Sequence, residues 1–264
     1  MRIVVLAGGL STEREVSISS GTLVAEALRS KGHEVVLLDV FMGYEENICD
    51  IDALFKQNYS FTDGNSIGDD VENTITNIKE AKENRLDKTS RYIGRNVIEI
   101  CSEADITFLA LHGGEGENGQ LQATLDLFGI KYTGSGYLGS ALAMNKGLTK
   151  SVFMQKNINT PSGELYKNEK DALAWNMFPC IVKPCSGGSS VGVSKVENAD
   201  QYKKAVKEAL KYEDEIVVEQ FVTGREFSVG LIGGKACARS QSSGERKYPP
   251  DSRRRRTRPA GPRC

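Results

Sequence analysis

The stretch IVVLAGG at residues 3–9 decides how the first part of the chain folds. Its apolar start indicates a short buried strand, and the two glycines that follow indicate a tight turn. A helical apolar pattern then runs over residues 15–30 and ends at Gly32, before a second apolar run at residues 35–40. A strand, a helix and a strand in this order require a parallel sheet with the connecting helix on one face.

The same pattern continues further along the chain. An apolar run at residues 106–111 predicts another strand, and a helix is expected over residues 119–128. We therefore expect residues 1–134 to form an open parallel α/β sheet, in which ligands usually bind at the carboxyl ends of the strands. Residues 44–100 are polar and weakly periodic apart from a helix at 71–85. We interpret them as an insertion or peripheral structure that carries no site.

A second domain is expected over residues 135–236, because the pattern changes after Pro161. The elements predicted there are a helix over 138–156, strands over 180–184 and 191–193, a helix over 200–211 and a strand over 215–219. The first two of these strands flank a loop rich in glycine and serine, which predicts an antiparallel pair. The result is an α+β domain.

Composition narrows the class of protein. The chain has 264 residues, of which 39% are hydrophobic and 26% charged, and this excludes a disordered, collagen-like or disulfide-dense protein. No apolar run approaches the ~18 to 20 residues of a membrane span, and residues 1–6 show no secretory pattern. We expect a cytoplasmic protein without a membrane partner. The six cysteines form no CxxC pair, which favours reduced thiols over a zinc site.

The last part of the chain differs in composition from the rest. Residues 235–264 hold ten Lys or Arg and two acidic residues. Hydrophobic periodicity stops after Ala236, so we expect residues 237–264 to be an aberrant, basic, disordered tail, which a shifted reading frame explains better than an evolved domain. The alternative is a nucleic-acid or membrane-surface patch at residues 253–256. We predict no nucleic-acid partner, because Tyr248 is the one aromatic residue among these charges.

The segment GGLSTEREVS at residues 8–17 lies where the first strand gives way to the helix. Backbone N–H groups at a helix start attract anions, and a carboxylate beside them, such as Glu13, is well placed to hold a substrate ammonium group. The segment lacks the GxGxxG pattern of dinucleotide-binding proteins. The alternative is structural: the glycines form a tight turn, and Glu13 or Glu15 caps the helix.

A second glycine-rich segment, HGGEGENG at residues 112–119, also follows a predicted strand. Its four glycines allow the backbone to approach a ligand closely, and His112 is one of two imidazoles in the chain. His112 and Gly113 are therefore candidate binding residues. The alternative is a histidine held by a backbone carbonyl in an ordinary loop.

Lys183 stands at the end of a predicted strand, before a loop that contains Gly188, Ser189 and Ser190. A lysine charge followed by N–H and hydroxyl donors suits a triphosphate. The order differs from a Walker A motif, in which the lysine follows the glycines. A solvated hairpin loop is the alternative. Lys146 is a second candidate cation, although a single lysine on a helix is more often only solvated.

Glu219 and Glu226 follow the last predicted strand. An extended segment there can offer backbone groups to an adenine edge, while the two carboxylates accept protons from the exocyclic amine and the ribose hydroxyls. The alternative is two ordinary surface glutamates.

Taken in order, these motifs resemble those of D-alanine–D-alanine ligases, members of the ATP-grasp superfamily. The ordered set is the segment at 8–17, His112-Gly113, Asn145-Lys146, Val182-Lys183-Pro184 with the loop up to Gly192, and Glu219 followed by Glu226. Each motif is weak or moderate alone, and the ordered set is specific. The resemblance covers residues 1 to about 236 and implies an N-terminal substrate-binding α/β domain, followed by an incomplete α+β ATP-grasp domain.

The resemblance also implies roles for individual residues. Glu13 would bind the ammonium group of a first D-alanine, His112 with Gly113 would lie near its carboxylate, and Ser189 would help to close the site. Glu13 and Ser189 are thus the catalytic candidates. The residues implied to bind ATP are Lys146, Lys183, Gly188, Ser189, Ser190, Glu219 and Glu226.

The activity implied is the ATP-dependent ligation of two D-alanines, through an acylphosphate, for peptidoglycan precursor synthesis. ATP and Mg²⁺, or Mn²⁺ in its place, are implied as cofactors, and a homodimer is implied as the assembly. In the family, the metal ligands and the second D-alanine pocket lie in the part after residue 236, so no metal ligand is assigned here. The second substrate stays open between D-alanine, D-serine and D-lactate. The alternative is an inactive fragment that binds nucleotide weakly or not at all.

Overall fold

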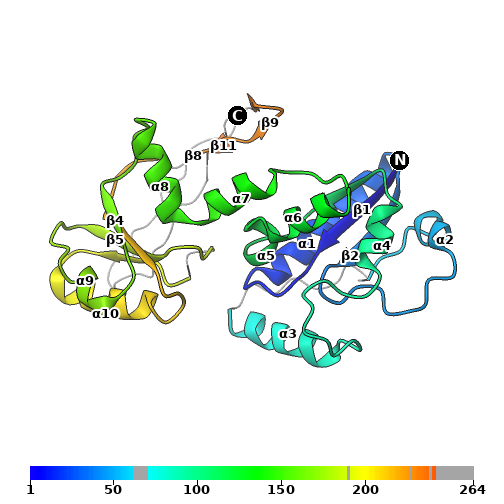
Figure 1. Cartoon of the computed structure of the whole chain (residues 1–264), viewed down its shortest axis with the longest axis horizontal. Coiled ribbons are helices and arrows are strands. Elements are labelled where there is room, and N and C mark those ends of the chain that lie inside the picture. Colours follow the sequence, from blue (N-terminus) through cyan, green and yellow to red (C-terminus); the bar gives the residue numbers. More distant parts are fainter. Residues whose placement is uncertain (62–70, 189–190, 226, 238–239, 242–264) are drawn as a thin grey trace, which may run out of the picture.

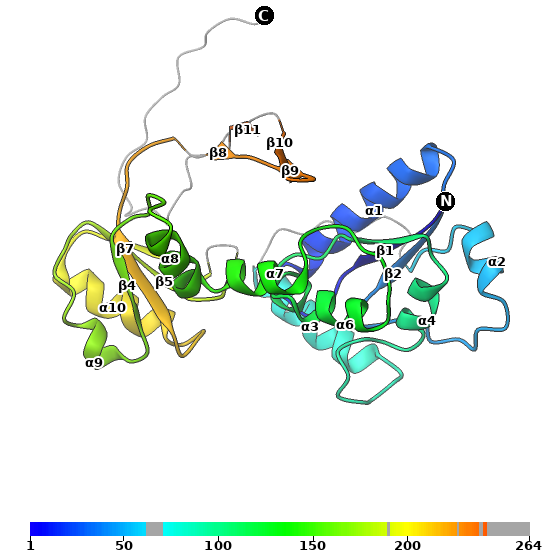
Figure 2. The same cartoon turned by 45° about the horizontal axis from the view of Figure 1, so that its top comes forward.

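The chain folds into two lobes that are joined through helix α7, Tyr137–Met144 (Figure 1). The computed structural model describes residues 1–61, 71–188, 191–225, 227–237 and 240–241. Figure 2 shows the same two lobes from another direction, with α7 between them. Within these ranges, no helix combines the length and the apolar character needed to span a membrane.

The first lobe contains the parallel sheet that the sequence predicts. Strand β1, Arg2–Ala7, lies between β2, Glu34–Asp39, and β3, Ile106–Leu109, and both pairings are parallel. Helix α1, Arg14–Ser30, connects β1 to β2 and packs on one face of the sheet (Figure 1). Every residue of β1 from its second position onward is buried, which explains why this strand reads as an uninterrupted apolar run.

The opposite face is covered by short helices, some of them from residues 44–100. These helices are α2, Ile51–Lys56, α4, Val97–Ser102, and α6, Gln120–Leu127. Phe55 and Ile100 are fully buried in the cluster that they form with β1 and β2. Interpreting residues 44–100 as peripheral was therefore wrong for these segments. One or two helical turns contain too few residues to show a clear period, and the sequence pattern missed them for that reason.

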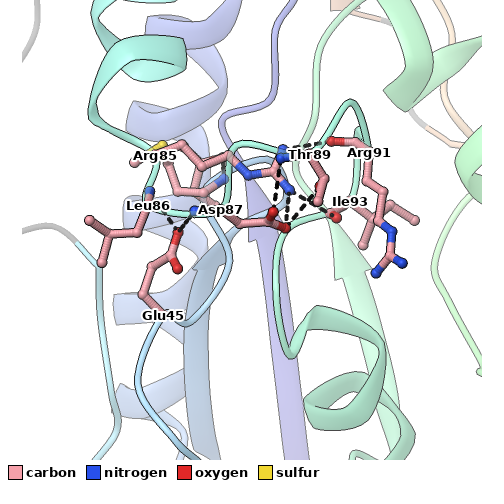
Figure 3. Close-up of polar contacts among 9 residues, drawn as sticks. Glu45, Arg85, Leu86, Asp87, Thr89, Arg91 and Ile93 are labelled. Carbon is pink, nitrogen blue, oxygen red and sulfur yellow. Dashed lines mark hydrogen bonds and ion pairs between the residues drawn. The ribbon is translucent and has the colours of Figure 1, made fainter.

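A buried arginine organises the loop that follows α3, Val71–Asn84. Arg85 is 1% exposed, and its guanidinium donates to the carbonyls of Arg91 (2.6 Å) and Ile93 (3.4 Å). It also pairs with Asp87 at 3.2 Å, and the backbone N–H groups of Leu86 and Asp87 donate to Glu45 (Figure 3). A guanidinium bound to several acceptors holds the loop in one conformation.

This loop supports the glycine turn after β1. A Cβ atom built on Gly9 would lie 2.5 Å from the hydroxyl of Tyr92, so the tyrosine fits directly against the glycine backbone. Burial raises the pKa of Tyr92, and the charge of Glu115 raises it further. The phenol therefore stays neutral and serves as a fixed wall of the turn.

The second lobe contains an antiparallel sheet of four strands. Its strand order is β4-β7-β5-β6, and α9 and α10 pack against it. The bounds are β4, Gly163–Tyr166, α9, Glu169–Ala172, β5, Cys180–Pro184, β6, Ser194–Val196, α10, Ala199–Ala209, and β7, Ile216–Gln220. The predicted antiparallel pair is present, but its second strand is residues 194–196, because a turn occupies part of the predicted 191–193 segment and Gly192 has a φ of +70°.

Two further predictions need correction. The helix expected over residues 138–156 is two helices, α7 and α8, Lys146–Gln155, because Asn145 adopts an extended conformation and its side chain caps α8 by accepting from the N–H of Leu148 at 2.8 Å. Strand β11, Ser240–Gln241, falls inside the segment expected to be disordered, yet it pairs with β8, Phe227–Ser228. Residues 242–264 lie outside the described residues. Strands β9, Leu231–Ile232, and β10, Lys235–Ala236, form another short pair.

We predict that Arg85→Met destabilises the first lobe by roughly 1 to 3 kcal/mol, because two partly buried carbonyls lose their guanidinium donor and Asp87 loses its ion-pair partner. Urea unfolding followed by circular dichroism measures this loss. Arg91→Met is the matched control, since Arg91 contributes its backbone carbonyl and its side chain is exposed. Equal stability of the two variants would contradict the role given to Arg85.

Candidate functional site

The turn after β1 is held by a buried ion pair. Gly8 and Gly9 have φ values of +72° and +81°, in the left-handed region that favours glycine. The carboxylate of Asp39, at the end of β2, accepts from the N–H of Gly9 (3.3 Å) and of Phe41 (2.8 Å) and pairs with Arg14. Arg14 also donates to the carbonyl of Gly9 at 2.6 Å. A Cβ on Gly8 would overlap the Asp39 carboxylate, so this geometry requires glycine.

Ser11 connects this turn to the loop after β3. Its hydroxyl donates to the carbonyl of His112 at 2.5 Å and accepts from the N–H of Glu13 at 3.1 Å. The segments at 8–17 and 112–119, which the sequence analysis selected separately, therefore meet at the carboxyl end of the sheet. Parallel strands bring their ends together in this way.

The carboxylate of Glu13 lies between glycines of both lobes. Its Oε2 atom is 2.7 Å from the position of a Cβ on Gly113 and 3.0 Å from that of a Cβ on Gly188. Glu13 occupies the N-cap position of α1, but its side chain makes no capping hydrogen bond. The purely capping role considered for Glu13 is therefore not observed. Gly113 has a φ of +65°, so both space and conformation favour glycine there.

His112 points toward α1. Its Nε2 atom lies 3.1 Å from the hydroxyl of Ser20, and the direction of this hydrogen bond depends on the tautomer. The alternative considered for His112 was a contact with a backbone carbonyl, and the Nε2 partner is instead a side-chain hydroxyl. The imidazole remains half-buried beside the Gly113 loop.

Lys146 holds the loop that follows β5. This lysine begins α8, and its Nζ donates to the carbonyls of Cys185 (3.1 Å) and Gly187 (2.5 Å). Burial lowers the pKa of Lys146, and the positive charge of Lys183 lowers it further. The two ammonium groups thus repel each other in a partly buried place, an arrangement that an anion between them would stabilise.

Lys183 and Glu219 form a direct ion pair between neighbouring strands. Lys183 on β5 donates to Oε1 of Glu219 on β7, and Lys150 on α8 donates to Oε2 at 3.0 Å. Burial alone raises the pKa of Glu219, but the hydrogen bonds and charges of Lys183 and Lys150 outweigh it, so the pKa lies below the usual value. Glu219 therefore carries a negative charge that two lysines share.

A cavity of about 490 Å³ opens beside Lys146. Its walls come from the end of β3, residues 116–117, α6, the loop at residues 133–135 and α7, and they include Glu117, Gln122 and Met144. The cavity therefore borders the place where α7 connects the lobes.

The structure brings the candidate residues into two groups. Glu13 lies beside Gly113 and Gly188, and the His112 carbonyl binds Ser11 next to them. Lys146, Lys183 and Glu219 lie on the second lobe near the loop that contains Gly188. Ser189, Ser190 and Glu226 lie outside the described residues. Among the residues that are described, no three His, Cys, Asp or Glu side chains group together in a way that could hold a metal ion.

Three residues shape this region although the sequence pattern assigns them no role: Arg14, Asp39 and Lys150. Lys150 follows Lys146 by four positions, so both lie on one face of α8. This spacing is visible in the sequence and could have indicated Lys150 as a neighbour of Lys146. Asp39 and Arg14 come from different elements, and their pairing depends on the strand register.

We predict that Glu219→Gln lowers the unfolding free energy at pH 7 by about 2 to 4 kcal/mol, because it removes the charge that two partly buried lysines share. The stabilisation from a lowered carboxyl pKa is complete above the usual glutamate pKa of about 4.3 and is lost as the pH falls through the lower folded value. In urea titrations, the difference in unfolding free energy between Glu219→Gln and the unsubstituted chain should therefore narrow as the pH falls below about 4.3. Glu197→Gln is the control, because its ion pair is exposed. A gap that stays constant with pH would contradict this assignment.

Comparisons with known proteins agree with this geometry. The family model "D-ala D-ala ligase N-terminus" matches residues 2–135, and "D-ala D-ala ligase C-terminus" matches residues 142–248. The D-alanine–D-alanine ligase of Pediococcus pentosaceus is 43% identical over 240 residues, which are 89% of this chain and 67% of that protein. That of Aquifex aeolicus is 36% identical and covers 89% of this chain and 64% of its own length.

Solved structures of D-alanine–D-alanine ligases also resemble this chain. A D-alanine–D-alanine ligase from Bacillus anthracis superposes with a TM-score of 0.61 at 28% identity, over 91% of this chain and 64% of the other. A complex of a Bacillus anthracis ligase with ATP has a TM-score of 0.60 at 25% identity, over 94% of this chain and 68% of the other. This chain spans about two thirds of the length of these relatives. It belongs to the D-alanine–D-alanine ligase family.

Proposed function

We propose that this protein acts in the ATP-dependent ligation of two D-alanines, the reaction for which its relatives are named. The observation that supports this most directly is the carboxylate of Glu13 beside Gly113 of one lobe and Gly188 of the other. A carboxylate held between two glycine backbones is a suitable partner for a small ammonium group. We place this activity in the cytoplasm, in peptidoglycan precursor synthesis, with a homodimer as the assembly.

The first lobe supplies the amino-acid site. Glu13 pairs with the ammonium group of the first D-alanine, because a carboxylate and an ammonium form a strong charge-assisted hydrogen bond. His112 and the backbone of Gly113 lie on the carboxylate side of that substrate. The Arg14–Asp39 pair and Ser11 fix the turn, so that Glu13 is in place before the substrate arrives.

The second lobe supplies the nucleotide site. Lys146 and Lys183 face the phosphates, Gly188 with Ser189 and Ser190 covers them, and Glu219 with Glu226 accepts from the adenosine. Two cations are needed because the phosphoryl group must approach another anion, the D-alanine carboxylate, and charge repulsion opposes this step. Burial and the charge of Lys183 lower the pKa of Lys146, so a phosphate between these two lysines would favour the charged form of Lys146.

The reaction itself has two steps. An oxygen of the first D-alanine carboxylate attacks the γ-phosphorus, and ADP leaves with the electron pair of the broken P–O bond. The amino group of the second D-alanine then attacks the acylphosphate carbon, loses a proton and displaces phosphate, which gives the dipeptide. Magnesium supplies charge neutralisation in phosphoryl transfer, but the described residues contain no matching ligand cluster, so none of these steps is assigned to it.

We predict that Glu13→Gln weakens D-alanine binding by at least about tenfold, because one charge-assisted hydrogen bond contributes on the order of 1.5 to 3 kcal/mol. ATP affinity should stay unchanged. Isothermal titration of D-alanine and of ATP into the full chain measures both, and D-alanine-dependent phosphate release reports on turnover.

Glu26→Gln is the matched control, because Glu26 is exposed on the same helix. Loss of ATP binding with intact D-alanine binding in Glu13→Gln would reassign Glu13. An unsubstituted chain that binds ATP without releasing phosphate would favour the alternative of a nucleotide-binding protein without turnover.

A further inference from the structure

Lys150 is buried in the second lobe, and its ammonium group is fully engaged. The side chain is 8% exposed, and Nζ donates to Oε2 of Glu219 (3.0 Å), to the hydroxyl of Thr160 (3.2 Å) and to the carbonyl of Pro161. A lysine ammonium has three N–H donors, and these three acceptors use all of them. Lys150 is therefore fixed in place and has no donor left for a ligand.

Lys183 is held less firmly. Its side chain is 21% exposed, and it donates to the other oxygen of the same carboxylate, Oε1 of Glu219. It stands at the end of β5, immediately before the loop that Lys146 holds through the carbonyls of Cys185 and Gly187. An anion at this loop would thus compete with Glu219 for Lys183.

Glu219 has little freedom to follow Lys183. On β7 it is paired with Gly163 of β4 on one side and Ile181 of β5 on the other. A Cβ on Gly163 would lie 2.5 Å from the Cβ of Glu219, so the neighbouring strand packs directly against this side chain. Both neighbouring strands therefore hold Glu219 in place.

We infer that Lys150 is a positioning residue that allows Lys183 to exchange the Glu219 carboxylate for a nucleotide phosphate. A mostly buried carboxylate that loses its sole cation is strongly unfavourable. Lys150 remains bound to Oε2, so Glu219 stays compensated and in register while Lys183 turns to the phosphates. This inference rests on the proposed nucleotide site and adds a residue that touches neither the nucleotide nor the amino acid.

The test compares two ligands that differ in their need for Lys183. ATP requires Lys183 to leave Glu219, whereas adenosine, without phosphates, does not. Isothermal titration of the full chain with each ligand gives the ratio of ATP affinity to adenosine affinity. In Lys150→Met we expect this ratio to fall about tenfold, the size of one lost charge-assisted interaction. Lys150→Arg keeps the positive charge, so its ratio of ATP affinity to adenosine affinity should stay close to that of the unsubstituted chain.

Two further variants separate this role from simple structural support. Lys156→Met is the matched control, since Lys156 is an exposed residue at the end of the same helix, and its ratio should equal that of the unsubstituted chain. Glu219→Gln removes the carboxylate through which Lys150 acts. The double variant Lys150→Met with Glu219→Gln should therefore show the same ratio as Glu219→Gln alone, a comparison that stands even where Lys150→Met does not fold.

The outcomes distinguish a failure of this inference from a failure of the proposed nucleotide site. An equal loss of ATP and adenosine affinity in Lys150→Met, or a further fall in the ratio when Lys150→Met is added to Glu219→Gln, overturns the positioning role while the nucleotide site stands. An unsubstituted chain, folded by circular dichroism, that binds neither ligand overturns the proposed nucleotide site and this inference with it.

Discussion

The arrangement of the site depends on the space around one carboxylate. Glu13 reaches a position where the backbones of Gly113 and Gly188 both come close, so that a side chain at either residue would press against its carboxylate. Gly113 belongs to the loop after β3 of the first lobe, and Gly188 to the loop after β5 of the second. This contact is where the two lobes meet at the proposed substrate position, and the buried Arg14–Asp39 pair holds the turn that delivers Glu13 to it.

Charge is distributed differently in the two lobes. In the first lobe, the ionic groups serve to shape the backbone, since Asp39 binds N–H groups of a turn and Arg85 binds carbonyls of a loop. In the second lobe, Lys150 and Lys183 share the carboxylate of Glu219, while Lys146 binds carbonyls of the loop after β5 and Glu213 accepts from the N–H of Ser186 in the same loop. Burial and the nearby charge of Lys183 both disfavour the charged form of Lys146, so an anionic ligand beside these two lysines would be favourable.

The sequence predicts those parts of the molecule that long buried elements define. The parallel sheet, α1 and the antiparallel β5–β6 pair follow from apolar runs and glycine turns, and the parallel order of β1, β2 and β3 brings the two glycine-rich segments together. Short helices such as α2 and α4 were missed because one or two turns show no clear period. The break at Asn145 was missed because an N-cap resembles any other polar residue inside a helical pattern.

For the site, the sequence indicates Lys183 and Glu219 as separate candidates, and the structure shows in addition that they are ion-paired neighbours on β5 and β7. The register of β5 against β7 decides this contact, and register depends on the packing of the whole sheet. Lys150 was missed because its importance comes from the partner it finds at residue 219, a contact across 69 positions of the chain.

Hydrogen–deuterium exchange of the full chain with a non-hydrolysable ATP analogue tests the central claim most directly, because it reports where the nucleotide binds without requiring turnover. We predict slower exchange in peptides that cover residues 183–188, and a further slowing at residues 8–17 and 112–119 only when D-alanine is added. Protection by the nucleotide confined to the first lobe, or protection by D-alanine confined to the second, would contradict the assignment of the two sites to the two lobes.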